Sequence, residues 1–286
     1  YAFMENHSGT FRVLSMSRAL QVSRSGFYAW RRRQSQPSPR RRRRKHMDDA
    51  VKKAFDAKKG RSGSPGLTRD LADAGQQYDR KTVATSMRRQ GLRAKAAKKF
   101  KATTNSKHSL PVAPNLLQQN FTATAPNQKY VSDITYLWTD AGWLYLATVI
   151  DLYSRLVVGW AMSERMTTQL VCDALQMALW RRGMPSGVIV HSDRGSQYCS
   201  AAYQALIRKH GLLCSMSAKG CCYDNACAES FFHTLKVEAI HGERFATREE
   251  MRQTVFEYIE VDYNRTRRHS ANGYISPQAF EAQRVA

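Results

Sequence analysis

Three carboxylates stand apart from their apolar surroundings in the second half of the sequence. Asp133 interrupts a run of strand-forming residues, although aspartate is disfavoured inside strands. Asp193 follows the buried-looking segment 188–192, and Glu229 lies in a helical pattern that begins near Asn225. Carboxylate oxygens hold Mg²⁺ while leaving positions open for water and phosphate. Two such ions about 4 Å apart suit phosphoryl transfer, so the three residues predict a two-metal site.

The helical pattern that carries Glu229 has two faces. The apolar face suits a core and consists of Ala228, Phe231, Phe232, Leu235 and Ala239. The other face holds Asn225, Glu229, His233 and Lys236, and is either a solvated surface or the wall of a site. For Glu229 alone the solvated surface is the more frequent case. Lys236 points the same way and could clamp a phosphate, while Asp151 and Asp224 compete for the ligand roles.

The elements around these carboxylates alternate between strands and helices. Strand patterns cover 130–137, 143–150 and 156–161, with a turn at 140–142. They are followed by a helix at 168–181, a strand at 188–190, a helix near 201–209, a short strand at 212–216, and helical patterns at 225–241 and 248–264. This order predicts a mixed α/β sheet with helices on both faces. Asp193 then lies at the carboxyl end of a strand, where crevices of open sheets form.

Positive charge is concentrated at the start of the chain. The 286 residues hold 45 Lys and Arg against 23 Asp and Glu, a net charge of +22. Residues 1–110 contain 28 of these cations and 7 of the anions, a net charge of +21. Such a field serves phosphate neutralisation or an anionic membrane, and nucleic acid is the favoured partner. The longest apolar stretch, 143–150, is far short of the roughly 20 residues that span a bilayer, so no membrane partner is expected.

Helical patterns in the basic part predict two DNA-binding units. Residues 11–33 fit two helices joined by a turn at Val22 and Ser23, which is a helix-turn-helix or an ordinary helical hairpin. Six cations at 40–45 are expected to form a flexible arm. A second helix pair at 67–74 and 81–89 is a further DNA-binding unit or a charged solvated face. The residues expected to contact DNA are Arg24, Arg31, Arg32, Arg33, Arg40, Arg41, Arg42, Arg43, Arg44, Lys81, Arg88 and Arg89.

All six cysteines follow residue 171. Cys221, Cys222 and Cys227 could form part of a zinc site with His210 or His233, but the paired C-x2-C spacing of zinc sites is absent. Reduced, partly buried thiols are the favoured interpretation.

Several segments closely resemble bacterial insertion-sequence transposases of the DDE type, which share a catalytic core with retroviral integrases. The segments are VSDITY at 131–136, HSDRGSQY at 191–198, DNACAESFF at 224–232, DYNRTRRH at 262–269 and SRSGFY at 23–28. As in that family, 35 residues separate Asp193 from Glu229, and Lys236 matches the family's basic position. The lead-in at 220–223 departs from the pattern in having two cysteines instead of one, which affects no catalytic position.

The resemblance implies an RNase H-like core with Asp133, Asp193 and Glu229 as metal ligands, and with Lys236 and Asn225 as DNA contacts. It implies a Mg²⁺-dependent transposase, with two ions per site and Mn²⁺ as a substitute. Such an enzyme cuts one strand at each element end and joins the freed 3′-OH to another phosphodiester. Its partners would be double-stranded DNA, at least one further copy of the chain, and an upstream-frame helix-turn-helix and leucine-zipper segment joined by frameshifting. Its location would be the bacterial cytoplasm, at the nucleoid.

The expected domains are a helix-turn-helix with a basic arm at 1–45, a second helical DNA-binding unit at 46–100, a linker at 101–127, the catalytic core at 128–245 and a helical extension at 246–286. Two alternatives share the basic first third. One is a non-catalytic DNA-binding protein with an inert core, which has no use for three metal ligands. The other is a structure-selective nuclease on the same fold, which would hydrolyse DNA without joining it.

Overall fold

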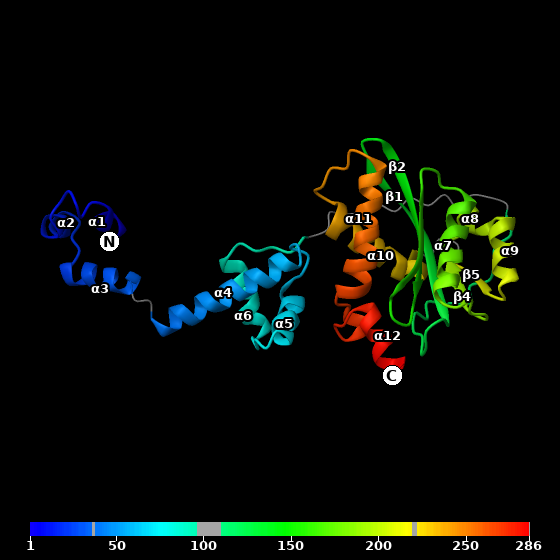
Figure 1. Cartoon of the computed structure of the whole chain (residues 1–286), viewed down its shortest axis with the longest axis horizontal. Coiled ribbons are helices and arrows are strands. Elements are labelled where there is room, and N and C mark those ends of the chain that lie inside the picture. Colours follow the sequence, from blue (N-terminus) through cyan, green and yellow to red (C-terminus); the bar gives the residue numbers. More distant parts are fainter. Residues whose placement is uncertain (36–37, 96–109, 219–221, 286) are drawn as a thin grey trace. The chain divides into compact units, whose positions relative to one another are not determined.

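The computed structural model describes residues 1–35, 38–95, 110–218 and 222–285. The chain forms two compact units, Tyr1–Ala94 and Lys95–Ala286. The first unit is helical, and the second is built on a sheet (Figure 1). No helix in the described ranges has the length and apolar character needed to cross a membrane.

The first unit begins with three helices around a small core of their own. These are α1 (Ala2–Asn6), α2 (Val13–Ala19) and α3 (Arg24–Ser35). Met4, Met16 and Phe27 are buried between them. The Ser23 hydroxyl accepts a hydrogen bond from the Gly26 amide at 2.9 Å, so it caps the start of α3. The predicted pair of helices joined by a turn at Val22 and Ser23 is therefore confirmed.

Three further helices complete the first unit: α4 (Pro39–Ala57), α5 (Ser64–Asp73) and α6 (Arg80–Arg89). Their core is Val51, Leu67, Leu71, Val83 and Met87. The expected flexible arm at 40–45 is wrong, because these residues form the first turns of α4. Ser38 caps that helix by accepting from the Arg41 amide, and Pro39 occupies the first turn, where its missing amide costs nothing. The expected domain boundary at 45/46 therefore falls inside a helix.

The second unit contains a five-stranded mixed sheet. Its strands are β1 (Lys129–Thr139), β2 (Gly142–Asp151), β3 (Val157–Ser163), β4 (Ile189–Ser192) and β5 (Leu213–Met216), in the order β3-β2-β1-β4-β5. The β1–β2 and β2–β3 pairs are antiparallel, whereas β4 runs parallel to both β1 and β5. The predicted mixed sheet is confirmed, and β1 is where a meander of three strands meets the parallel part.

Helices cover both faces of this sheet (Figure 1). The elements on one face are α7 (Thr168–Arg181), α8 (Ser196–Cys199) and α9 (Ala201–Lys209). The other face is covered by α10 (Ala226–Leu235), the π-helix η2 (Lys236–Ile240), α11 (Arg248–Glu257) and the π-helix η3 (Tyr258–Thr266). The predicted apolar stripe continues from α10 into η2 and packs in the core on this face of the sheet, where all its members are buried: Ala228, Phe231, Phe232, Leu235 and Ala239. At Gly159 of β3 a Cβ would lie 2.2 Å from the Ala174 oxygen, so glycine permits the approach of α7.

Residues 110–127, expected to be part of a linker, pack on the sheet unit. Leu117 is buried in the same core as α10, and the amides of Leu116 and Leu117 donate to the Ser215 hydroxyl at 2.9 and 3.2 Å. Apolar residues in this segment do not recur at helical or strand spacing, so the sequence pattern did not predict the packing, which depends on single side chains. The expected linker positions 101–109 lie outside the described residues.

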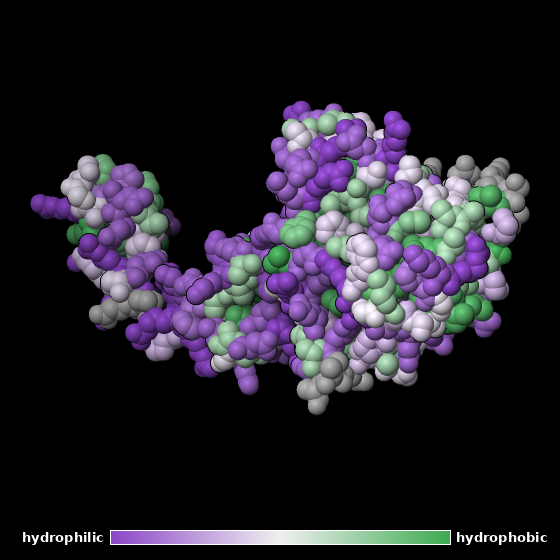
Figure 2. All heavy atoms as spheres, turned by 45° about the vertical axis from the view of Figure 1, so that its right-hand side comes forward, coloured by the Kyte–Doolittle hydropathy of each residue, from purple (hydrophilic) through white to green (hydrophobic). Residues whose placement is uncertain are grey.

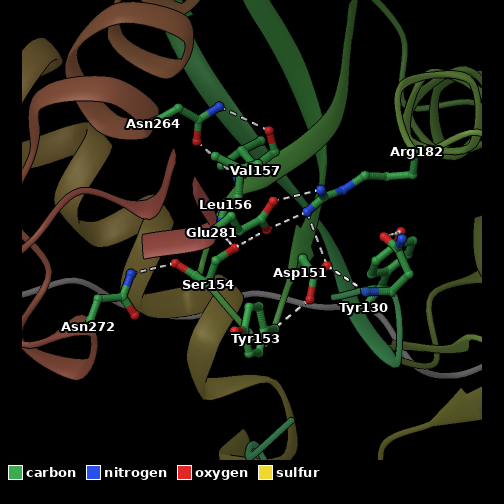
Figure 3. A network of polar contacts seen from close by, with 11 residues as sticks. Tyr130, Asp151, Tyr153, Ser154, Leu156, Val157, Arg182, Asn264, Asn272 and Glu281 are labelled. Carbon is green, nitrogen blue, oxygen red and sulfur yellow. Dashed lines mark hydrogen bonds and ion pairs between the residues drawn. The ribbon is translucent and has the colours of Figure 1, made fainter. Parts of the chain in front are cut away.

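The C-terminal part closes the sheet unit. It consists of the short η1 (Cys222–Asn225) before α10, then η4 (Ser270–Asn272) and α12 (Pro277–Val285) after η3. Arg182, after α7, lies between Asp151 at the end of β2 and Glu281 of α12, and pairs with both carboxylates (Figure 3). Asn264 exchanges two hydrogen bonds of 3.0 Å with the main chain of Val157. The extension is thus attached to the sheet by polar contacts far apart in sequence.

Candidate active site and DNA-binding surface

Asp133 and Asp193 come together because β1 and β4 are parallel neighbours. Val131 pairs with His191 across these strands, and each aspartate follows its member of that pair by two residues. Both aspartates line one cavity of about 520 Å³. The cavity therefore lies where the antiparallel and parallel parts of the sheet meet, which is the usual location of sites in open sheets.

Each aspartate is held by the main chain through one oxygen. Oδ1 of Asp133 accepts from the Ile134 amide at 2.8 Å, and Oδ1 of Asp193 accepts from the Gly195 amide at 2.9 Å. Burial raises the pKa of Asp133 well above its usual range, and the negative charges of Asp193 and Glu229 add to the shift. The Ile134 amide and Lys236 oppose that shift. A divalent cation would relieve this repulsion, so the pair fits a metal site.

Glu229 lies in the first turns of α10 and is more exposed than the two aspartates. Its charge acts on Asp133, and partial burial raises the pKa of Glu229 itself. Glu229 is not among the residues that line the cavity. Within the described part of the chain, no group of three His, Cys, Asp or Glu side chains is arranged to hold a metal. The structure thus brings two predicted ligands together and leaves the third close enough to interact electrostatically.

Lys236 is buried at the point where α10 changes into the π-helix η2. Its ammonium lies 5.0 Å from the ring centroid of Tyr136, which is a cation–π contact. Burial lowers the pKa of Lys236 to about 8, although the charge of Asp133 opposes this. Glu238, in the same π-helix, accepts from the Tyr258 hydroxyl and from Arg267. These contacts fix η2, and π-helical turns are frequent at functional sites.

The two competing aspartates have structural roles. Asp151 accepts from the Asn127 and Tyr153 amides at 2.9 Å each and pairs with Arg182 at 3.1 Å (Figure 3). Oδ2 of Asp224 accepts from the Asn115 side chain at 3.0 Å and from the Ala218 amide at 2.7 Å. Both side chains are almost fully buried, and neither lines the cavity.

Asn225, expected to contact DNA, is 5% exposed. Its side-chain amide donates to the Ser132 oxygen at 3.4 Å, which joins the start of α10 to β1 beside Asp133. This burial argues against a direct DNA contact. Of the cysteines considered for zinc, Cys227 accepts from Arg155, and Cys221 lies outside the described residues, as does the side chain of Cys222.

A second candidate site is a basic groove on the helical unit. The groove, of about 510 Å³, lies between α4 and α6, and its cationic lining residues are Arg40, Arg43, Arg44, Lys81 and Arg89. Hydrophilic residues dominate the visible surface over α4–α6 in Figure 2. Because these cations project from two packed helices, they form a concave positive surface that suits a phosphate backbone.

Arg89 differs from its neighbours in the basic groove. It pairs with Asp48, which also accepts from the Ser86 hydroxyl at 2.6 Å. Partial burial raises the pKa of Asp48, but the Arg89 and Ser86 hydrogen bonds and the Arg89 charge lower it overall. Arg89 therefore joins α6 to α4 and has less positive charge to offer DNA than the other four cations.

The remaining predicted DNA contacts lie outside this groove. Arg31 pairs with Glu5 at 3.2 Å, Arg33 donates to the Ala29 oxygen at 3.1 Å, and Arg41 donates to Gln34. The other four are solvent-exposed: Arg24, Arg32, Arg42 and Arg88.

The sequence interpretation missed much of the cavity wall. Tyr136, Trp143 and Tyr145 on β1 and β2, with Met166 and Gln197, line the cavity beside the aspartates. Alternating aromatics at 136, 138, 143 and 145 were the available signal, because alternate residues of a strand share a face.

Family models match most of the chain. Two integrase core domain models match residues 123–222 and 229–285, and an HTH-like domain model matches residues 41–100. These matches assign the sheet unit to the integrase core class of enzymes, and the predicted RNase H-like fold, preceded by helical DNA-binding segments, is confirmed. Members of this class are metal-dependent polynucleotidyl transferases.

Similar proteins narrow the class to a family. "Transposase InsF for insertion sequence IS3A" of Escherichia coli (strain K12) is 59% identical over 286 residues, which cover 100% of this chain and 99% of the relative. "Insertion element IS600 uncharacterized 31 kDa protein" of Shigella sonnei is 48% identical over 265 residues, or 93% of this chain and 97% of the relative. The chain belongs to the family of insertion-sequence transposases with an integrase core, as its sequence motifs predict.

Solved structures of low identity match part of the chain. The HTLV-2 integrase catalytic core domain in complex with magnesium (trimeric form) gives a TM-score of 0.44 at 12% identity, covering 56% of this chain and 99% of that chain. A chain of the simian T-cell lymphotropic virus intasome gives 0.47 at 15% identity, covering 62% of this chain and 60% of that chain.

Proposed function

We propose that this protein is the DNA transposase of an insertion sequence, and that it cuts the element ends and joins the freed 3′-OH to target DNA. The observation that carries the proposal is the shared cavity of Asp133 and Asp193 at the junction of β1 and β4. Two acidic side chains whose charges repel each other in one cavity are costly for folding, and a reaction that needs divalent cations explains their presence. The family of the chain supplies the reaction type.

In this proposal Asp133, Asp193 and Glu229 hold Mg²⁺, with two ions per site and Mn²⁺ as a substitute. When bound, the ions would activate the attacking oxygen and stabilise the leaving oxygen. Each aspartate is oriented through its Oδ1 by a main-chain amide, and both line the cavity in which the ions would lie. Glu229, whose negative charge acts on Asp133, would complete the set.

The remaining residues act on the DNA. Lys236 neutralises a phosphate beside the cavity, because its ammonium already lies near Asp133 and Tyr136. Arg40, Arg43, Arg44 and Lys81 of the basic groove neutralise backbone phosphates of the element end. The predicted arginines outside the groove add contacts along the same duplex. At least two copies act together, since two ends must be cut in concert. The upstream-frame segment would join the same assembly at the bacterial nucleoid.

The test is Asp193→Asn and, separately, Glu229→Gln, in the full chain with duplexes that carry its element ends. Both variants should lose strand cleavage and the joining of pre-cut 3′-OH ends, while salt-sensitive binding of the ends persists. Cleavage retained by either variant would remove that residue from the metal site. Hydrolysis by the wild type without joining would instead identify a nuclease.

A further inference from the structure

The β1–β2 hairpin carries an aromatic surface that lies beside Asp133 and Asp193. We name it the aromatic wall: Tyr136, Trp138 and Trp143. Trp138 pairs with Trp143, and Tyr136 with Tyr145, so these side chains share one face of the hairpin. The ring centroids of Trp138 and Trp143 are 4.8 Å apart, and those of Tyr136 and Trp143 are 5.1 Å apart, both edge to face. The three rings therefore form one continuous surface.

Two of the three rings of the wall are exposed, and Tyr136 is half-buried. Trp138 is 56% exposed and Trp143 is 42% exposed. Most apolar side chains of the strands are instead buried in one of the two cores. Adjacent large rings that are exposed to solvent on a hairpin indicate a binding surface. Their apolar area contributes favourable burial free energy only when a partner covers it.

Two of the three wall residues line the cavity of the aspartates, and Trp138 packs against Trp143 beside it. Tyr136 and Trp143 line it together with Asp133 and Asp193. A phosphodiester at the aspartates therefore brings its neighbouring nucleotides within reach of the rings. Lys236, whose ammonium lies against the Tyr136 ring, supplies a positive charge at the boundary between the carboxylates and the wall.

The chemistry of the wall selects its ligand. Ring faces bind other π-faces, and every nucleobase has one. A base inside a duplex has both faces covered by its stacked neighbours, so only an unpaired or extruded base can lie on the wall. Stacking tolerates any sequence, so the wall suits a nucleotide whose position matters more than its identity.

We propose that the aromatic wall stacks one unpaired DNA base beside the phosphodiester on which the aspartates act. The wall thereby separates the strands at the cleavage site and positions the phosphate. This inference rests on the proposed function, because it needs a DNA strand in the cavity.

The experiment compares wild type with Trp143→Ala, as full chains, on element-end duplexes in which one nucleotide at a time is abasic. The abasic position moves through the five nucleotides on either side of the cleaved phosphodiester, on each strand. On unmodified DNA the variant should cleave about 10-fold more slowly. At the stacked position this ratio should fall to about one, because the base that Trp143 contacts is missing from both reactions. At every other position the 10-fold ratio should persist.

Three variants serve as controls. Trp143→Phe keeps an aromatic ring and should retain most of the wild-type rate. Trp138→Ala should lose rate with the same position dependence as Trp143→Ala, which provides a second measurement if one variant folds poorly. Trp180→Ala removes a tryptophan of α7 that is 68% exposed and outside the cavity, so it should change nothing on any substrate.

A ratio between wild type and Trp143→Ala that is the same at every abasic position would overturn the inference. A changed oligomeric state in Trp143→Ala without position dependence would assign the wall to a second copy of the chain, and would also overturn it. If wild type cleaves no element end with Mg²⁺ or Mn²⁺, the proposed function fails first, and the wall proposal fails with it.

Discussion

The two units of this protein use charge in opposite ways. In the helical unit, the cations of the basic groove lie around an open concave surface, and Arg89 shares its charge with Asp48. In the sheet unit, Asp133 is half-buried near two further carboxylates, and burial together with their negative charges raises its pKa. Exposed like charges cost little and contribute to affinity one at a time. Buried like charges cost folding free energy, so their presence indicates a reaction instead of a binding surface.

The largest expected effect comes from Asp133→Asn, which removes one half-buried carboxylate and keeps the shape of the side chain. Cleavage of element ends should fall by about 10³-fold or more, because a metal ligand is lost. Without divalent metal, the melting temperature should rise by a few degrees, because the repulsion from Asp193 and Glu229 disappears. Cleavage assays and thermal unfolding measure the two effects. The control is Asp173→Asn, which replaces an exposed side chain of α7 and should change neither the cleavage rate nor the melting temperature. A lower melting temperature for Asp133→Asn would contradict the proposed charge repulsion.

The second effect tests the helical unit. The triple change of Arg40, Arg43 and Arg44 to Gln should weaken the binding of element ends by about 10- to 100-fold. The number of counterions released on binding, which the salt dependence of the affinity reports, should fall by up to about three. Cleavage at saturating protein should stay nearly unchanged. The control is Arg41→Gln with Arg42→Gln, in the same turns of α4 but outside the groove. An equal loss per charge in the control would show that the groove has no special role.

The third effect concerns the segment before β1. Leu117→Ala should lower the free energy of unfolding of the sheet unit by about 2–4 kcal/mol, because Leu117 is 1% exposed and part of the core. Leu116→Ala removes a neighbour that is 43% exposed and should cost under about 0.5 kcal/mol. Urea unfolding measures both. Equal costs would mean that this segment does not pack on the sheet in solution.

The smallest effect is the pH dependence of stability. Burial, together with the charges of Arg267 and Arg155, lowers the pKa of His269 from 6.5 to about 4. Between these values the unfolded chain binds a proton that the folded chain does not, so stability falls as the pH drops from 6.5 towards 4. His269→Asn should make this loss shallower in urea titrations at pH 7, 6 and 5. An unchanged slope would show that His269 does not contribute.

The strands and helices could be predicted from the sequence wherever buried side chains recur at a regular spacing. The strands, α7, α9 and the apolar stripe of α10 are confirmed because alternation or a 3.6-residue repeat determines which side chains face the core. The two aspartates were predicted because each interrupts or ends such a pattern. That they share a cavity could not be predicted from local patterns, because it depends on the pairing of Val131 with His191 between strands that are far apart in sequence.

Local sequence patterns gave wrong predictions where a few specific contacts determine the structure. The basic run at 40–45 is helical because Ser38 and Pro39 start a helix ahead of it, and because arginine and lysine have high intrinsic helix propensities. Asn225 shares a helical face with Glu229 but turns inward to the Ser132 oxygen. Leu117 lies in a segment without periodicity and is still buried.

The ion pairs of Arg182 also connect parts of the chain that leave the ribosome at different times. Glu281 follows Arg182 by 99 residues and Asp151 by 130, and all three meet at one end of the sheet (Figure 3). Until Glu281 has left the ribosome, the nascent chain can form the strands, and Arg182 has Asp151 as its carboxylate partner. The last helix then adds the second carboxylate, so loss of α12 would leave part of the Arg182 guanidinium without its hydrogen-bond acceptor at the edge of the core.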